Sequence, residues 1–247
     1  MAFIRPYKES DFDACAHICR ATLPPSLSSS PIAAKLAPYL WTHQYTFLSP
    51  STCWILDDGS GKAVGYCIGC PDIYAFAATY PSYVTSVLSP AVAAPADLKT
   101  REPWTIMDDS LFGLTSPDDA ATNVQKVNVV SMAQTAYNAQ WLLFEGNEHL
   151  TDKWRATMHI DLLDEWQGKG WGRKLIDTFV GSVKGSGQNY GQGIWIGIGG
   201  ENGKVVNFYE KVEFRVIEKP GAGAGAGDSI NMARDIAKPG DAGGLAI

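Results

Sequence analysis

The sequence of 247 residues is poor in charge and contains no long apolar run. Charged residues make up 19% of it, and the net charge of −6 disfavours a protein that tracks nucleic-acid phosphates. No stretch approaches the ~20 apolar residues of a membrane helix. The first residues lack the basic-then-apolar pattern of a secretory signal. We therefore expect no nucleic-acid or membrane partner and a cytoplasmic location, with the nucleus left open.

Cysteine is scarce, and its pattern does not suit a disulfide scaffold. The five cysteines are an odd number, and the sequence holds no Asn-x-Ser/Thr glycosylation site. Cys67 and Cys70 are spaced as in metal sites, but in a strand a three-residue step places them on opposite faces. Since no second such pair exists in the sequence, we expect free, mostly buried thiols and no metal site.

Several nucleotide and hydrolase motifs are also missing. The sequence contains no Gly-x-x-x-x-Gly-Lys-Ser/Thr, no Gly-x-Gly-x-x-Gly after an N-terminal strand, no Gly-x-Ser-x-Gly and no His-Glu-x-x-His. These absences exclude a Walker loop, a dinucleotide fold, a hydrolase nucleophile elbow and a zinc-protease helix. What remains is a chain with 45% hydrophobic residues and many aromatics, which can bury a substantial core.

Hydrophobic periodicity predicts strands and helices in the order β-α-α-β-β, an inserted helical segment, then β-α-β-α-β-β. This order predicts an α/β (α+β) protein with a mixed, mainly antiparallel sheet and helices on both faces. The expected strands are 3–6, 52–56, 63–70, 155–163, 194–198, 214–218 and 229–234. The expected helices are 12–19, 31–47, 171–184 and 204–211.

The chain is expected to form one domain, 1–236, followed by a flexible tail, 237–247. Within this domain, residues 71–153 differ in composition from the rest, because prolines recur along them. Helices are expected there at about 72–88, 118–138 and 141–149. Residues 71–150 contain nine acids against three bases, which accounts for the whole net charge of −6.

A glycine-rich loop joins a strand to a helix at Gly168, Gly170 and Gly172. Glycine lets the backbone approach a ligand, and the first N–H groups of a helix are unpaired at the positive end of its dipole. Lys169, Arg173 and Lys174 add positive charge. The pattern predicts a phosphate cradle. The alternative is a tight turn with solvated basic side chains.

Two segments resemble the GNAT superfamily of acyl-CoA-dependent N-acyltransferases. Gln167-Gly-Lys-Gly-Trp-Gly172 is similar to its Gln/Arg-x-x-Gly-x-Gly/Ala signature. About 30 residues on, Asn202 to Phe214 is similar to its Asn-x-x-Ala-x-x-Phe/Leu-Tyr-x-Lys-x-Gly-Phe segment. The resemblance covers 154–235 well and 1–70 loosely. It implies a twisted GNAT-like sheet of about six or seven strands.

A narrower resemblance concerns the acetyltransferase-like C-terminal domain of O-GlcNAcases. It is carried by the start, Ile4-Arg-Pro-Tyr-Lys-Glu-Ser-Asp-Phe, by the strand Gly65 to Gly69, and by the long insertion. Here that domain would stand alone. Some members of that group have a degenerate CoA loop, whereas this sequence keeps the glycines, which favours real cofactor binding.

The resemblance implies acetyl-CoA as cofactor and transfer of its acetyl group to a primary amine, by direct attack in a ternary complex. The acceptor would be a small molecule or a peptide, and the protein a monomer or homodimer. Tyr209 would protonate the departing thiolate, and Asn202 would contact the pantetheine arm. The remaining cofactor residues it implies are the backbone of Asp161, Leu162 and Leu163 for the pantetheine, and Gln167, Gly168, Lys169, Gly170, Trp171, Gly172, Arg173 and Lys174 for the pyrophosphate.

The general base is less clearly marked. His159 and Asp161 are two apart on a strand, so both face one side, and either could act directly or through a water. Alternatively, one of them is a structural polar group. Many family members carry a Glu before the Asn, where this chain has Gly197 to Glu201. Glu213 replaces the usual Gly, which suggests a different turn.

Two further features bear on the acceptor. Trp166, Trp171 and Trp195 are expected near the site, either lining a substrate pocket or packing in the core. The acidic insertion is expected either to cover the acceptor groove and attract a cationic amine or to present a solvated helical face. Charge reversal of Asp108, Asp109, Asp118 and Asp119 would separate these two interpretations.

Three function classes follow from these residues. The leading one is the N-acetyltransferase, with Tyr209, Asp161 and His159 as catalytic residues. The alternative is a catalytically weak or inactive module that binds acetyl-CoA or a protein partner. The third is a structural or interaction domain with an empty cofactor cleft.

Overall fold

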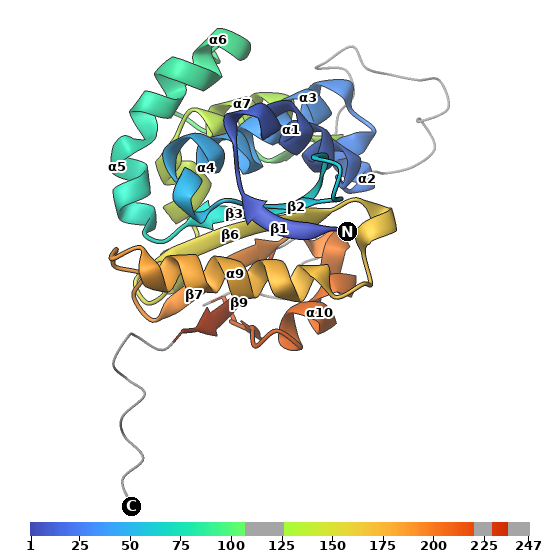
Figure 1. Cartoon of the computed structure of the whole chain (residues 1–247). Coiled ribbons are helices and arrows are strands. Elements are labelled where there is room, and N and C mark those ends of the chain that lie inside the picture. The colour runs from blue at the N-terminus through green and yellow to red at the C-terminus, as the bar shows by residue number, and fades with distance from the viewer. Residues whose placement is uncertain (107–125, 220–228, 237–247) are drawn as a thin grey trace, which may run out of the picture.

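The computed structural model describes residues 1–106, 126–219 and 229–236, which are built around a seven-stranded sheet (Figure 1). Its strand order is β1-β2-β3-β6-β7-β9-β8. Of these neighbours β6 and β7 are parallel, and the other pairs are antiparallel. The predicted mixed, mainly antiparallel α/β class is therefore confirmed. The strands are β1 (Phe3–Pro6), β2 (Trp54–Asp57), β3 (Ala63–Cys70), β6 (Ala156–Leu162), β7 (Gly193–Ile198), β8 (Arg215–Val216) and β9 (Ile230–Asp235).

Helices cover both faces of the sheet. Figure 1 shows most of the N-terminal helices together on one face, with α9 (Trp171–Gly185) along the opposite face and α10 (Val206–Glu210) near its N-terminal end. The first layer contains α1 (Phe12–Ala21), α3 (Pro31–Trp41), α4 (His43–Leu48), α5 (Ile73–Tyr83) and α7 (Val129–Ala136). Shorter helices are α2 (Pro25–Ser28), α6 (Ser89–Ala91), α8 (Glu148–Thr151) and α10 (Val206–Glu210). No helix of the described ranges is long and apolar enough to cross a bilayer.

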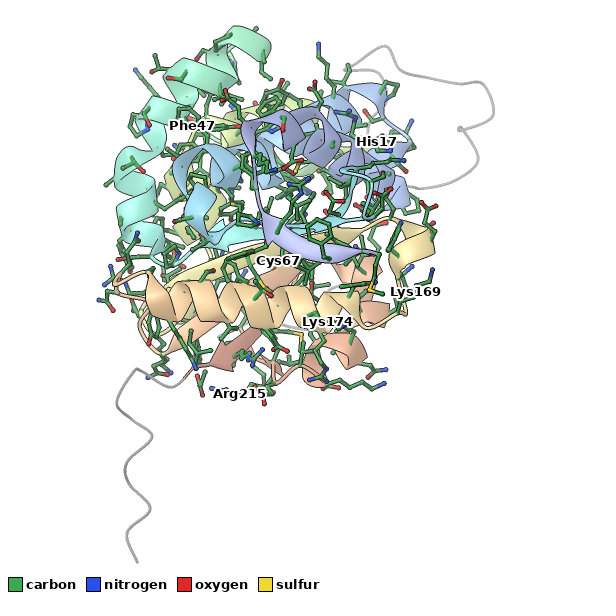
Figure 2. The ribbon with its side chains drawn as sticks, viewed as in Figure 1. His17, Phe47, Cys67, Lys169, Lys174 and Arg215 are labelled. Carbon is green, nitrogen blue, oxygen red and sulfur yellow. The ribbon has the colours of Figure 1, made fainter. Side chains whose placement is uncertain are left out.

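The sheet separates two hydrophobic cores, because successive strand residues point to opposite faces. Tyr66 and Ile68 pack under the N-terminal helices, whereas Cys67 packs against the α9 side (Figure 2). Cys70 joins the first core, so the two cysteines do lie on opposite faces. All five cysteines are free and buried, as the sequence predicted. Burial raises the pKa of the Cys53 thiol to about 12, which leaves it unreactive at neutral pH.

The predicted helix 31–47 is interrupted at Thr42. This residue has φ −129° and ψ −64°, so it ends α3 and precedes α4. Its hydroxyl oxygen lies 3.4 Å from the hydroxyl of Tyr66 on the sheet below. The apolar pattern of 31–47 continues across this break, because α3 and α4 both bury apolar residues in the same core, so the pattern did not reveal two helices.

The inserted segment folds differently from its sequence pattern in two places. The predicted helix 118–138 is wrong at its described start, since β5 (Lys126–Val127) pairs with β4 (Thr105–Ile106). α7 begins only after Asn128, whose side chain accepts hydrogen bonds from the N–H groups of Val130 and Ser131. The helix expected at 141–149 is instead a π-helical turn, 140–144, followed by α8, because Gly146 takes φ +78° between them.

The acids of the insertion are partly engaged in structure. Asp72 caps α5 and receives two-pronged hydrogen bonds from Arg155 at 2.8 and 2.9 Å. Glu145 pairs with Arg101. The acids proposed for charge reversal, Asp108, Asp109, Asp118 and Asp119, lie outside the described residues. So does the predicted tail, 237–247.

Candidate functional site

The sheet opens into a fork between β6 and β7. The two strands pair only at Ala156 with Ile194 and at Thr157 with Trp195. Beyond this point each continues along its outer neighbour, β6 with β3 and β7 with β9, and within the described residues they no longer pair with each other. The inner edges of both strands therefore present backbone N–H and C=O groups to the gap.

The register decides which residues offer these groups. The N–H of Leu163 donates to the carbonyl of Val64 at 3.0 Å, so this pair belongs to the β3–β6 ladder. Hydrogen-bonded pairs alternate along an antiparallel ladder. The backbone of Asp161 is consequently also turned toward β3, whereas Ile160 and Leu162 face the fork. Of the three residues 161–163 whose backbone was expected to face the pantetheine, only Leu162 faces the fork. Ile160, which was not predicted, faces it as well.

The glycine loop lies at the open end of the fork and starts α9. Gly168 and Gly170 have φ +69° and +80°, a region that favours glycine, and a Cβ on either would meet nothing within 4 Å. Gly170 is the N-cap and provides no side-chain cap, so the first N–H groups of α9 lack partners in the helix. The Gln167 side chain donates to the carbonyl of Leu162 at 2.8 Å, which ties this loop to the end of β6.

The three basic residues at the loop and the start of α9 make different contacts. Lys169 extends from the N-terminal end of α9 in Figure 2, with its ammonium 5.6 Å from the ring centroid of Trp166. The ammonium of Lys174 lies 4.4 Å from that of Trp171. The guanidinium of Arg173 instead donates to the carbonyl of Lys211 and so joins α9 to α10.

The start of α9 also packs against α10, which carries Tyr209. A Cβ added to Gly172 would lie 2.9 Å from the ring of Phe208, so this glycine allows a close contact between the helices. The Tyr209 ring packs edge-on against Phe208 and Phe214. Burial, together with the charge of Asp161, raises the pKa of Tyr209 and keeps its phenol protonated at neutral pH. Asn202 is half-buried in the turn before α10.

His159 and Asp161 come together on β6, as their spacing predicted. Nε2 of His159 lies 3.1 Å from Oδ2 of Asp161. The same carboxylate oxygen accepts a hydrogen bond from the hydroxyl of Tyr66, which is fully buried. Burial opposes ionisation of Asp161, but the charge and hydrogen bond of His159 and the Tyr66 hydroxyl outweigh it and lower its pKa. Asp161 is thus a fixed carboxylate beside a partly exposed imidazole.

The sequence and the fold were compared with those of known proteins. No family profile matches the sequence, and no curated protein matches it. Among solved structures, that of SsHAT is 24% identical, with a TM-score of 0.70 over 96% of this chain and 99% of that one. PH1933 from Pyrococcus horikoshii OT3 is 12% identical, with a TM-score of 0.51 over 96% and 99%. The ribosomal-protein-S18-alanine N-acetyltransferase from Escherichia coli is 15% identical, with a TM-score of 0.45 over the full length of both chains.

The chain has the GNAT fold. The resemblance drawn from the two motifs is confirmed at this level. Glu213 stands where the GNAT pattern has a glycine, and it takes φ +71°, the left-handed conformation that favours glycine. Its carboxylate lies 2.7 Å from Nη2 of Arg234.

The tryptophans do not form one cluster in this GNAT fold. Trp166 and Trp171 pack on the α9 side, whereas Trp195 packs with Leu150 and Trp154. Glu201 accepts a hydrogen bond from the hydroxyl of Ser26 in α2. Sequence reasoning missed Tyr66 and Phe208 as parts of the site. The one signal for Tyr66 is a hydroxyl-bearing residue inside an otherwise apolar strand.

Proposed function

We propose that this chain is an acetyl-CoA-dependent N-acetyltransferase that acetylates a primary amine by direct attack in a ternary complex. The observation that carries the proposal is the fork of β6 and β7 with the start of α9 at its open end. The inward backbone of Ile160 and Leu162 fits the amides of a pantetheine arm, to which Asn202 would add a contact. The N–H groups from Gly168 to Lys174 fit a pyrophosphate. When bound, acetyl-CoA supplies the activated acetyl group.

His159 is the proposed general base. A neutral imidazole has one N–H, and the 3.1 Å contact to the ionised Asp161 favours placing it on Nε2. Nδ1 then accepts a proton from the attacking amine, and Asp161 stabilises the resulting imidazolium. Tyr66 holds the carboxylate in place as a positioning residue. Because an ammonium has no lone pair, this proton transfer is what makes the amine a nucleophile.

Tyr209 is the proposed acid. Its raised pKa keeps the proton on the phenol, which donates it to the departing sulfur. All five thiols are buried, which argues against a covalent acyl-cysteine and supports direct transfer. The narrower resemblance to the acetyltransferase-like domain of O-GlcNAcases, standing alone, remains part of this proposal.

The test is calorimetric titration with acetyl-CoA, followed by thiol release with a panel of primary amines. Gly170→Ala should weaken acetyl-CoA binding about tenfold, because a Cβ at positive φ costs about 1–2 kcal/mol. Gly181→Ala, in the same helix with open space around it, is the matched control and should bind normally. Tyr209→Phe should bind normally and turn over about a hundredfold more slowly.

Each result separates the function classes. Binding with no turnover of any amine would support the alternative, a cofactor-binding module. Absence of acetyl-CoA binding in the wild type would overturn the proposal and favour a structural domain.

A further inference from the structure

A partly open cavity lies beside the fork, between the sheet and the N-terminal helices. Its volume is about 260 Å³. His159 of the proposed catalytic pair forms part of its wall. The other lining residues are Leu40, Trp41, Tyr45, Leu142, Leu143, Asn147, Thr157, Met158, Trp195, Gly197, Gly199, Ser229 and Asn231.

We propose that this cavity is the acceptor pocket, and that it takes a small monoamine with an apolar body and a hydroxyl group. The proposal rests on the N-acetyltransferase function above and names its acceptor class. Its lining includes no Asp, Glu, Lys or Arg. A second ammonium group inside the cavity would therefore find no counterion in the lining, which disfavours polyamines.

Two buried polar atoms indicate the hydroxyl. Trp195 is 5% exposed and Asn231 4%, and within the described residues Trp195 Nε1 and Asn231 Oδ1 have no hydrogen-bond partner. Leaving such an atom unpaired costs about 1–3 kcal/mol. One is a donor and the other an acceptor. A single hydroxyl that entered between the two side chains would satisfy both atoms, because it accepts one hydrogen bond and donates another.

The strand register brings these two side chains to one face of the sheet. Trp195 lies opposite Ala233, and Gly197 opposite Asn231, so Trp195 and Asn231 are diagonal neighbours on one face of the sheet. Nδ2 of Asn231 lies 3.4 Å from Nε2 of His149, so the nitrogen of this amide has a hydrogen-bond partner and only its oxygen lacks one. An acceptor bound by its hydroxyl at this wall can extend its amine toward His159.

Gly197 has no side chain to occupy the cavity, so a larger residue at this position can be used to fill it. A Cβ there would meet only Asn231 Oδ1, at 3.8 Å, an ordinary van der Waals contact. Its φ is not in the positive range, so a larger residue is free of backbone strain. Gly197→Leu therefore fills the pocket without disturbing the sheet, and Gly181→Leu on the exposed side of α9 is the matched control.

The experiment compares amines that differ by one group. Tyramine and 5-amino-1-pentanol carry the hydroxyl, phenethylamine and pentylamine lack it, and spermidine tests the polycation. Binding to the CoA-loaded protein is followed by saturation-transfer NMR, and turnover by thiol release. We expect each hydroxylated amine to have a KM at least tenfold below that of its partner. Trp195→Phe should remove this preference, and Gly197→Leu should raise the KM for tyramine at least tenfold.

The failures are distinguishable. If the wild type does not bind acetyl-CoA, the proposed function fails. If acetyl-CoA binds but spermidine is preferred, or if Gly197→Leu leaves the KM for tyramine unchanged, the pocket is not the acceptor site although the function stands. Absence of binding by all four monoamines to the CoA-loaded wild type overturns the pocket as well.

Discussion

His159 and Asp161 stand side by side on β6, with 3.1 Å between Nε2 and Oδ2. A residue far away in the chain, Tyr66, fixes the carboxylate from the neighbouring strand. The imidazole of His159 thus lies between the carboxylate of Asp161 and the cavity described above. This arrangement assigns different roles to two residues that the sequence could not tell apart.

The first prediction follows from these roles. His159→Gln removes the proposed base and should lower kcat by about 10²- to 10⁴-fold with the affinity for acetyl-CoA unchanged. Asp161→Asn keeps the imidazole but removes the charge that stabilises its protonated form, so a smaller loss is expected. Steady-state kinetics of both variants provide the check. An active His159→Gln beside an inactive Asp161→Asn would instead make Asp161 the base, acting through a water.

The second prediction concerns the contact between Gly172 and Phe208. In Gly172→Ala the new Cβ lies 2.9 Å from the end of the Phe208 ring, so this exposed ring must move, which loosens the contact that holds α10 and Tyr209. We expect both weaker acetyl-CoA binding and lower kcat. Adding Phe208→Leu removes the obstructing ring and should restore both, as measured by calorimetry and thiol release. If Gly172→Ala behaves as the wild type, the contact does not position α10.

The third prediction concerns stability at Glu213. Its positive φ strains any residue with a Cβ, so Glu213→Gly should raise the free energy of unfolding by about 0.5–1 kcal/mol. Glu213 is itself exposed, so its pair with the largely buried Arg234 offsets only part of this gain, and Arg234 keeps its contact with Asp177. Glu213→Ala is the control, because it loses the pair and keeps the strain. Urea unfolding measures all three proteins, and equal values for the Gly and Ala variants would contradict the assignment.

The fourth prediction is a pH dependence of stability. His43 is 1% exposed and stacks on Phe12 with 3.7 Å between ring centroids. Burial, with a smaller effect of Arg20, lowers the pKa of His43 from 6.5 to about 4. The unfolded chain therefore binds a proton that the folded chain does not. Stability should fall by about 3 kcal/mol as the pH drops from about 6.5 to 4.

His43→Phe isolates this effect, because it keeps the stacked ring and removes the titration. Urea unfolding at several pH values should show a shallower decline for the variant. Burial also lowers the pKa of His149, but that contribution is common to both proteins and cancels in the difference. Parallel declines would show that His43 is not the residue responsible.

Much of the site was predictable because its signals are local. The strand before Leu163, the glycines of the loop and the apolar stripe of α9 are close in sequence, and their geometry follows from backbone sterics and period. The pairing of His159 with Asp161 follows from the same two-residue period. In the insertion the pattern failed, because the β4–β5 pair depends on residues 20 positions apart and Asn128 resets the start of α7.

The sequence by itself determined the class of fold, the glycine loop, the buried thiols and the common face of His159 and Asp161. Only the tertiary structure decided which backbone groups face the fork and which side chains contact one another there. Strand register turned Leu162 and Ile160, but not Asp161, toward the fork, and packing brought Tyr66 to Asp161 and Phe208 to Gly172. It also enclosed Trp195 and Asn231 in one cavity. These contacts join segments distant in the chain, so they depend on how the sheet pairs and not on local sequence preference.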